Sequence, residues 1–98
     1  YRNTPNMSLI FLEFRPLCSE KEFSRYWRSL RSRHQKEGLI LQSNLFKVRE
    51  GLFLGQVEFE DVQRTNVLSY YDSKESESDT LQGMCKSIRM IYTAIRAQ

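Results

Sequence analysis

The single histidine and the two cysteines are the residues of this chain that could form a nucleophile and its base. A thiol acts as a catalytic nucleophile when a histidine lies within hydrogen-bond reach of it. A helix is expected between Cys18 and His34, and at about 1.5 Å per residue it would separate them by on the order of 20 Å. Cys85 precedes the last expected strand and would lie at the same end of the sheet as Cys18. This geometry excludes a Cys–His dyad, and we predict that the chain is not an enzyme.

The spacing of the cysteines also argues against a metal site. Cys18 and Cys85 form no CxxC pair, and two thiols so far apart are too few for a zinc site or for the disulfide framework of a secreted domain. The sequence also lacks a glycine-rich loop that would cradle a phosphate. We therefore expect no cofactor, and two free thiols in the reducing environment of the nucleus or cytoplasm. A disulfide between the two cysteines is the alternative, because both would lie at one end of the sheet.

Length and composition predict one domain with a hydrophobic core. The chain has 98 residues, of which 40% are hydrophobic and 12% aromatic. Its longest apolar run, from Leu9 to Leu12, is far shorter than the roughly 18 residues that span a bilayer, so we expect no membrane association. Because the sequence begins at Tyr1, we expect it to be a segment of a longer protein. Its formal net charge of +3 is compatible with a nucleic-acid partner but does not require one.

Two periodic patterns organise the first half of the chain. Residues 8–14 (SLIFLEF) have the composition of a strand, which Pro16 would end. Ser19 and Glu22 have the spacing of a capping box, so a helix is predicted to begin there and to end near Gly38. One side of this helix carries large apolar and aromatic residues, and the opposite side carries basic ones. Its predicted buried side consists of Phe23, Tyr26, Trp27, Leu30 and His34.

The second half predicts a hairpin, a helix and a last strand. Residues 38–61 contain two β-rich runs around a turn at residues 49–51, where Gly51 permits a positive φ. Asp61 to about Lys74 is predicted as a helix. The inner side of this helix would carry Val62, Thr65, Leu68 and Tyr71. Residues 86–94 alternate in the manner of a strand, with Ile88, Met90 and Tyr92 on one side and Arg89, Ile91 and Thr93 on the other.

The order of these elements predicts the fold class. A βαββαβ chain is typical of the α+β, ferredoxin-like sandwich, in which two helices cover one face of a four-stranded antiparallel sheet. The domain would span residues 8–94, with flanks at residues 1–7 and 95–98.

The same segments resemble the RNA recognition motif (RRM) family over nearly the whole chain, from about Ser8 to Thr93. IFLEFRP followed by SEKEF is similar to the first strand of the family and the acidic opening of its first helix. GQVEFEDVQRTNVLSYY is similar to the third strand and the helix after it. LQGMCKSIRMIY is similar to the Leu-x-Gly loop and the last strand, with two extra residues. The resemblance implies the fold predicted above and single-stranded RNA as a partner.

The two strand motifs that carry RNA binding in this family are only partly present. Phe11 lies at the position of the first-strand aromatic that stacks on a base. LFLGQVEF corresponds to the eight-residue motif of the third strand, and it agrees at Gly55, Val57 and Phe59. Leu52 replaces the basic residue at its first position, and Leu54 and Gln56 replace the two stacking aromatics. The chain is thus similar to a divergent member with a degenerate third-strand motif.

The resemblance also implies which side chains face a ligand. The open face of the sheet would show Phe11, Glu13, Leu52, Leu54, Gln56, Glu58, Arg89 and Ile91. The core face would carry Ile10, Leu12, Phe14, Val57, Phe59, Ile88 and Met90. The predicted RNA-binding residues are Phe11, Leu54, Gln56, Arg89 and Ile91, together with Lys47 and Arg49 in a loop that would overhang the sheet. Two lost stacking platforms, at about 1–3 kcal/mol per base, and repulsion by Glu13 and Glu58 predict weak to moderate affinity.

Two functions from different classes follow. The first is a weak or atypical single-stranded RNA-binding module of a larger protein. The second is an interaction module that uses the apolar sheet or a helix surface to bind a protein partner or a second copy of itself. The basic residues of the first helix are interpreted as a solvated surface, with phosphate binding as the alternative. These basic residues are Lys21, Arg25, Arg28, Arg31, Arg33 and Lys36.

Overall fold

The structure is a computed structural model that describes residues 7–71 and 83–95, with side chains described as far as residue 91. It has α+β architecture. Its elements in order are β1 (Met7–Pro16), α1 (Glu20–Lys36), β2 (Gln42–Arg49), β3 (Leu52–Glu60), the 3-10 helix η1 (Asp61–Gln63), α2 (Arg64–Tyr71) and β4 (Cys85–Ile95). The predicted polar loop after the second helix and both flanking segments lie largely outside the described residues. Among the described helices, none combines the length and the apolar composition that crossing a bilayer requires.

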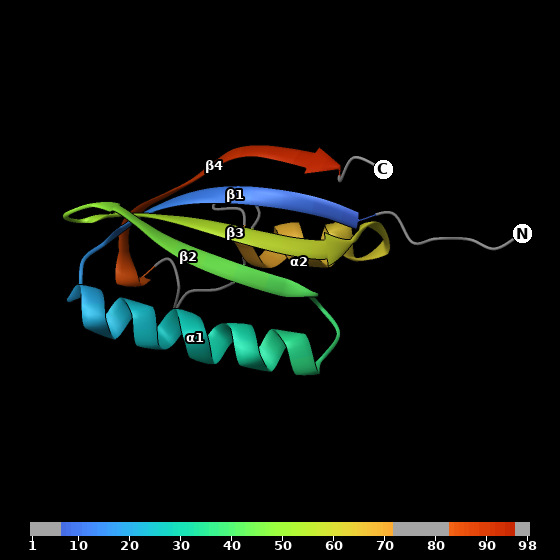
Figure 1. Cartoon of the computed structure of the whole chain (residues 1–98), viewed down its shortest axis with the longest axis horizontal. Coiled ribbons are helices and arrows are strands. Elements are labelled where there is room, and N and C mark those ends of the chain that lie inside the picture. The colour runs from blue at the N-terminus through green and yellow to red at the C-terminus, as the bar shows by residue number, and fades with distance from the viewer. Residues whose placement is uncertain (1–6, 72–82, 96–98) are drawn as a thin grey trace, which may run out of the picture.

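The four strands form one antiparallel sheet in the order β2-β3-β1-β4 (Figure 1). Alternate residues of β1 and β3 point to one face, where they meet buried side chains of both helices. Both helices therefore cover the same face of the sheet. This core contains Ile10, Leu12, Phe14, Val57 and Phe59 from the sheet, Phe23, Trp27 and Leu30 from α1, and Val67 and Tyr71 from α2. The predicted core face is confirmed, with Ile88 and Met90 half-buried at its margin.

The first helix begins and ends where the sequence predicts. The Ser19 hydroxyl accepts a hydrogen bond from the backbone N–H of Glu22, which is the N-cap bond of a capping box, and donates to the Glu22 carboxylate at 3.2 Å. Lys36 is the last helical residue, and Gly38 follows with φ of +79°, a conformation that ends the helix at little steric cost. The predicted stripe is buried, apart from Tyr26 at its edge, which is half-buried.

The buried side of the second helix differs from the prediction. Val67 and Tyr71 are the buried residues of α2, whereas Thr65 is exposed and Val62 is 85% exposed. The cause is the 3-10 turn at Asp61–Gln63, because its three residues per turn shift the phase of the helix that follows. A single helical period drawn from Asp61 onward therefore misplaced Val62 and Thr65, whereas Tyr71 is buried as predicted and Leu68 packs partly against the core.

The last strand also departs from strict alternation. Leu12 pairs with Met90 but Phe11 pairs with Tyr92, so β4 carries one extra residue, Ile91, at this step. Such a bulge leaves one residue unpaired and locally disrupts the ladder. The predicted two-residue period holds for Ile88, Arg89 and Met90, and the side chains of the predicted Tyr92 and Thr93 lie outside the described residues.

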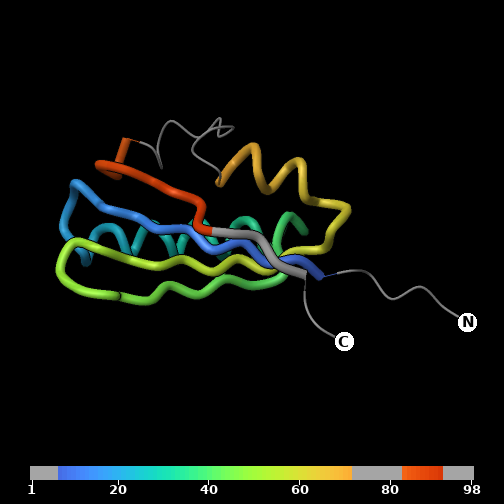
Figure 2. The backbone as a smooth tube through the Cα atoms, turned by 90° about the horizontal axis from the view of Figure 1, so that it is seen from above, coloured from blue at the N-terminus to red at the C-terminus, as the bar shows by residue number. Residues whose placement is uncertain are grey.

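One end of the sheet gathers the β1–α1 connection, the β2–β3 turn and the start of β4 (Figure 2). Pro16 pairs with Cys85, and the backbone N–H of Leu17 donates to the carbonyl of Met84 at 2.7 Å. Both cysteines are free thiols, as predicted, and both lie at this end. Burial, with a smaller effect from nearby Cys18, raises the pKa of the Cys85 thiol to about 12. Cys85 is therefore a packed, protonated core residue.

At the opposite end of α1, the only histidine is a core residue rather than a ligand. The Tyr71 hydroxyl lies 2.6 Å from His34 Nδ1, and the rings of Tyr70 and Tyr71 meet the imidazole edge-on. Burial, with a smaller effect from Arg33, lowers the pKa of His34 below its ordinary value of 6.5. The imidazole is therefore mainly neutral at pH 7, and it shares a hydrogen bond with the tyrosine hydroxyl.

This buried imidazole predicts a pH dependence of stability. Below pH 6.5 the unfolded chain binds a proton at His34 that the folded chain does not, so folding stability is complete above pH 6.5 and falls as the pH drops toward the lower folded-state pKa. Urea unfolding at pH 7.5 and 5.5 measures the difference. The variant His34→Gln keeps a hydrogen-bonding side chain beside Tyr71 and lacks the titration, so its stability should change less between these pH values. An equal change in both proteins would contradict the assignment.

Candidate nucleic-acid interface

The face of the sheet opposite the helices brings together residues far apart in the sequence. Strand register aligns Phe46, Leu54, Glu13 and Arg89 in one row across the four strands. The next row contains Asn44, Gln56 and Phe11. Four predicted binding residues, Phe11, Leu54, Gln56 and Arg89, therefore share this open face. No helix covers it within the part of the chain that the structure describes.

Of the two carboxylates that we expected to repel phosphates, Glu13 is paired with two arginines and Glu58 is buried. Glu13 Oε1 lies 3.0 Å from Arg15 Nη1 and 3.1 Å from Arg89 Nη2. The hydrogen bond from Arg15 holds the pKa of the Glu13 carboxyl below its usual range, and the charge and hydrogen bond of Arg89 add a smaller effect in the same direction. Glu58 is buried and accepts a hydrogen bond of 2.8 Å from the side-chain amide of Gln42. Arg15, Glu13 and Arg89 together carry one net positive charge, which favours an anion at this place on the open face.

A polar pair and a half-buried aromatic lie side by side in the second row. The side-chain amide of Asn44 donates to Gln56 Oε1 at 3.0 Å, and Gln56 pairs with Phe11 across β1 and β3. Both amides keep further donors and acceptors, the groups that hydrogen-bond the edges of an unpaired base. Gln56 thus replaces a stacking ring with hydrogen-bonding capacity.

Sequence reasoning missed a second aromatic on this face. Phe46 lies in β2 beside Leu54, and its side chain is 51% exposed. The alternation of residues along β2 carries the signal for this aromatic. Ser43 and Leu45 face the core, and because successive side chains of a strand point to opposite faces, Asn44 and Phe46 lie on the open face. Val48 and Ile91, 55% and 41% exposed, are further apolar groups exposed on the outer strands β2 and β4.

The two predicted basic residues of the hairpin separate onto opposite faces. Both belong to β2 rather than to a loop, so the prediction that Lys47 overhangs the open face is wrong: Lys47 pairs with the core-facing Phe53. Its ammonium lies 2.8 Å from Glu20 of α1 and 2.8 Å from Glu50, and these two carboxylates raise its pKa. Arg49 is exposed and pairs with Leu52, because a one-residue shift of register between Lys47 and Arg49 returns it to the side of the open face.

The open face therefore combines two aromatic rings, a pair of amides and flanking arginines. Such a surface provides rings for stacking, hydrogen bonds for base edges and cations for phosphates. The described residues contain no group of three or more histidine, cysteine or acidic side chains that would hold a metal ion. In comparisons with protein-family models, curated proteins and solved structures, none matches this chain.

Proposed function

We propose that this chain is a single-stranded RNA-binding module with a ferredoxin-like, RRM-like fold. The order β2-β3-β1-β4, with both helices on one face, supports the fold. The observation that carries the function is the adjacency of exposed Phe46, half-buried Phe11 and the Asn44–Gln56 amide pair on the open face. None of these groups is needed to close the core on the other side of the sheet.

In this proposal each part of the face has one task. Phe46 and Phe11 stack on two bases, and each stack contributes about 1–3 kcal/mol. Gln56 and Asn44 hydrogen-bond base edges, and Arg89 and Arg49 contact phosphates from the two sides of the sheet. With two aromatics rather than the family's three, the affinity is weak to moderate.

A protein partner is the second candidate, and the exposure of apolar groups favours it. Phe46, Val48 and Ile91 are each more than two-fifths exposed. Apolar groups at this exposure also suit docking of another protein surface or of a second copy of the chain. This candidate differs from the first in one measurable way: it needs neither the amide pair nor the arginines.

The variant Phe46→Ala tests the proposed function. If Phe46 stacks on a base, its affinity for a pool of short single-stranded RNAs should fall by about 1–3 kcal/mol, or roughly 5- to 150-fold. Stability should barely change, because the ring is half exposed. Fluorescence anisotropy measures binding, and urea unfolding measures stability.

Val62→Ala is the matched control. It also removes an exposed apolar side chain, but from η1, outside the sheet, and its RNA affinity should equal that of the wild type. Unchanged RNA binding by Phe46→Ala would refute the stacking role. If the same substitution instead abolished a concentration-dependent increase in sedimentation coefficient, the face would bind a second copy of the chain.

A further inference from the structure

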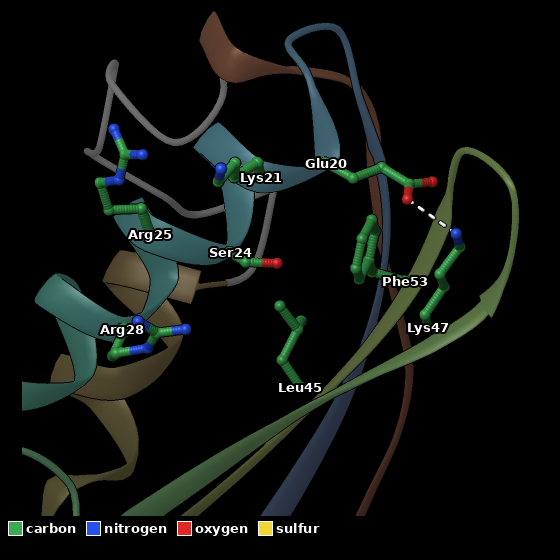
Figure 3. A pocket seen from close by; sticks show the side chains of 8 residues that line it. All are labelled: Glu20, Lys21, Ser24, Arg25, Arg28, Leu45, Lys47 and Phe53. Carbon is green, nitrogen blue, oxygen red and sulfur yellow. Dashed lines mark ion pairs between the residues drawn. The ribbon is translucent and has the colours of Figure 1, made fainter.

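A groove separates α1 from the outer strand β2 on the side of the sheet that faces the helices. Its main part has a volume of about 540 Å³, and a narrower part of about 260 Å³ lies beside it. Ser24 and Arg28 point from α1 toward β2, and the Glu20–Lys47 ion pair lies at the hairpin end (Figure 3). The two parts share Ser24, Arg28 and Leu45 in their linings, so they form one continuous groove, which we call the α1–β2 groove.

The α1–β2 groove contains most of the excess positive charge of the chain. Its main part is lined by the cations of Lys21, Arg25, Arg28 and Lys47 and by one carboxylate, that of Glu20. This balance of three positive charges equals the formal net charge of the whole chain, +3. Four cations against one carboxylate give the main part of the groove a positive local charge that attracts an anion.

The cations on α1 are not used to stabilise the helix. Among the described residues, Lys21, Arg25 and Arg28 form no ion pair, although Glu22 lies three residues before Arg25, within reach of a helical pair. Glu20, the only acid in the lining, is already engaged by Lys47 and by the backbone N–H of Gly51. A ligand anion would therefore meet Lys21, Arg25 and Arg28 with no carboxylate paired to them among the described residues.

The other groups along the groove are mostly hydrogen-bond donors. At the narrow end Arg31 lines the wall and donates to the carbonyl of Ser43 at 3.4 Å. Trp27 lines the same end, and its indole Nε1 has no hydrogen-bond acceptor within the described residues. Leu45 and Phe53 are the only apolar residues of the described chain that line the main part. The groove therefore offers little apolar surface against which a peptide could bury its side chains. A ligand made of acceptors and negative charge fits best, and a phosphodiester backbone has both properties.

The groove lies next to the open face, which indicates that the phosphate backbone belongs to the RNA bound on that face. Phe46 and Lys47 are consecutive residues of β2, with Phe46 on the open face and Lys47 in the groove. One strand therefore separates the two surfaces, and β2 forms the outer edge of the sheet. Lys21, Arg25 and Arg28 follow the helix axis over about 10 Å at about 1.5 Å per residue, so they can follow a backbone over more than one phosphate.

We propose that the α1–β2 groove binds the phosphate backbone of single-stranded RNA after the strand has crossed the outer edge of β2. This inference rests on the proposed function of the open face and extends it: bases bind on one side of β2, and downstream or upstream phosphates bind on the other. Short RNAs occupy the open face alone, whereas longer RNAs also reach the groove.

The double variant Arg25→Gln/Arg28→Gln tests this proposal, with oligouridylates of 4 and 12 nucleotides as probes. Each phosphate contact to a single strand changes the slope of log K against log salt by about 0.7. Loss of two contacts should therefore make the slope for the 12-mer shallower by about 1.4 and leave the 4-mer unaffected. The control Lys36→Gln/Lys86→Gln removes the same charge from exposed positions outside the groove lining and should behave as the wild type for both lengths.

The outcomes separate this proposal from the one it rests on. If both RNAs bind and the groove and control variants show the same slope for the 12-mer, the groove proposal is overturned and the open face stands. If neither RNA binds the wild type, the RNA-binding function itself fails and this inference with it. Tighter binding of a poly-glutamate peptide than of the 12-mer, lost in the groove variant, would assign the groove to an acidic protein and overturn the phosphate assignment.

Discussion

Replacement of Trp27 by alanine is expected to lower the free energy of unfolding by about 3–5 kcal/mol. The indole is only 3% exposed and contacts rings from two other elements, Phe14 of β1 at a centroid distance of 5.2 Å and Tyr71 of α2 at 6.0 Å. Its loss would leave a cavity where α1, the sheet and α2 meet. Because domains of this size are stable by about 5–15 kcal/mol, this is a large fraction of the total.

Urea unfolding followed by circular dichroism measures the effect of Trp27→Ala. Arg28→Ala is the matched control, since it truncates the next residue of the same helix at an exposed position and should change stability by no more than about 0.5 kcal/mol. A loss below 1 kcal/mol for Trp27→Ala would show that the indole is not a central part of the core.

The second large effect is expected at Gly55, where the core leaves no room for a side chain. A Cβ atom there would lie 2.7 Å from Phe14 Cε2 and 2.9 Å from Trp27 Cη2, both well inside contact distance. Gly55 pairs with Leu12 of β1 and with Leu45 of β2, so strands on both sides hold its backbone in place. Gly55→Ala should therefore cost about 1–3 kcal/mol through overpacking, and Gly55→Val more.

A double variant tests whether the indole causes this cost. Trp27→Phe removes the two indole carbons that would lie 2.9 and 3.3 Å from a Cβ at Gly55, so Gly55→Ala should be less destabilising in that background, with a coupling energy of about 0.5–3 kcal/mol. Gly83→Ala is the control, because a Cβ at Gly83 would meet no atom within 4 Å. Strictly additive losses from Gly55→Ala and Trp27→Phe would rule out the contact as the cause.

Sequence patterns predicted those parts of the fold in which local rules and packing agree. The capping box at Ser19 and the apolar stripe of α1 were sufficient to place that helix, and alternation of residues was sufficient to separate the two faces of β1 and β3. The 3-10 turn before α2 and the bulge at Ile91 were not predictable from the sequence. Each is a local irregularity that shifts the periodic pattern of the residues after it and has no residue pattern of its own. Gly55 was noted as a family match, but the structural reason for a glycine there is the close approach of the Phe14 and Trp27 rings.

The same division holds for the candidate site. Phe11, Leu54, Gln56 and Arg89 could be placed on one face because the period of a strand is two. Lys47 was misplaced because β2 continues to Arg49, which moves this residue out of the turn and onto the other face. The α1–β2 groove depends on which strand lies beside α1, and that is a property of tertiary structure that no single element shows.

The bulge at the end of β2 has a consequence for how the protein behaves in concentrated solution. Among the described strands β2 has a neighbour on one side only, so its other side offers backbone N–H and C=O groups to a strand from another molecule. The register shift between Lys47 and Arg49 interrupts the regular spacing of those groups, and both residues carry positive charge. A second sheet approaching this side would meet a kinked, cationic strand. The irregularity thus disfavours strand pairing at this edge, while its charge leaves the same edge attractive to a polyanion.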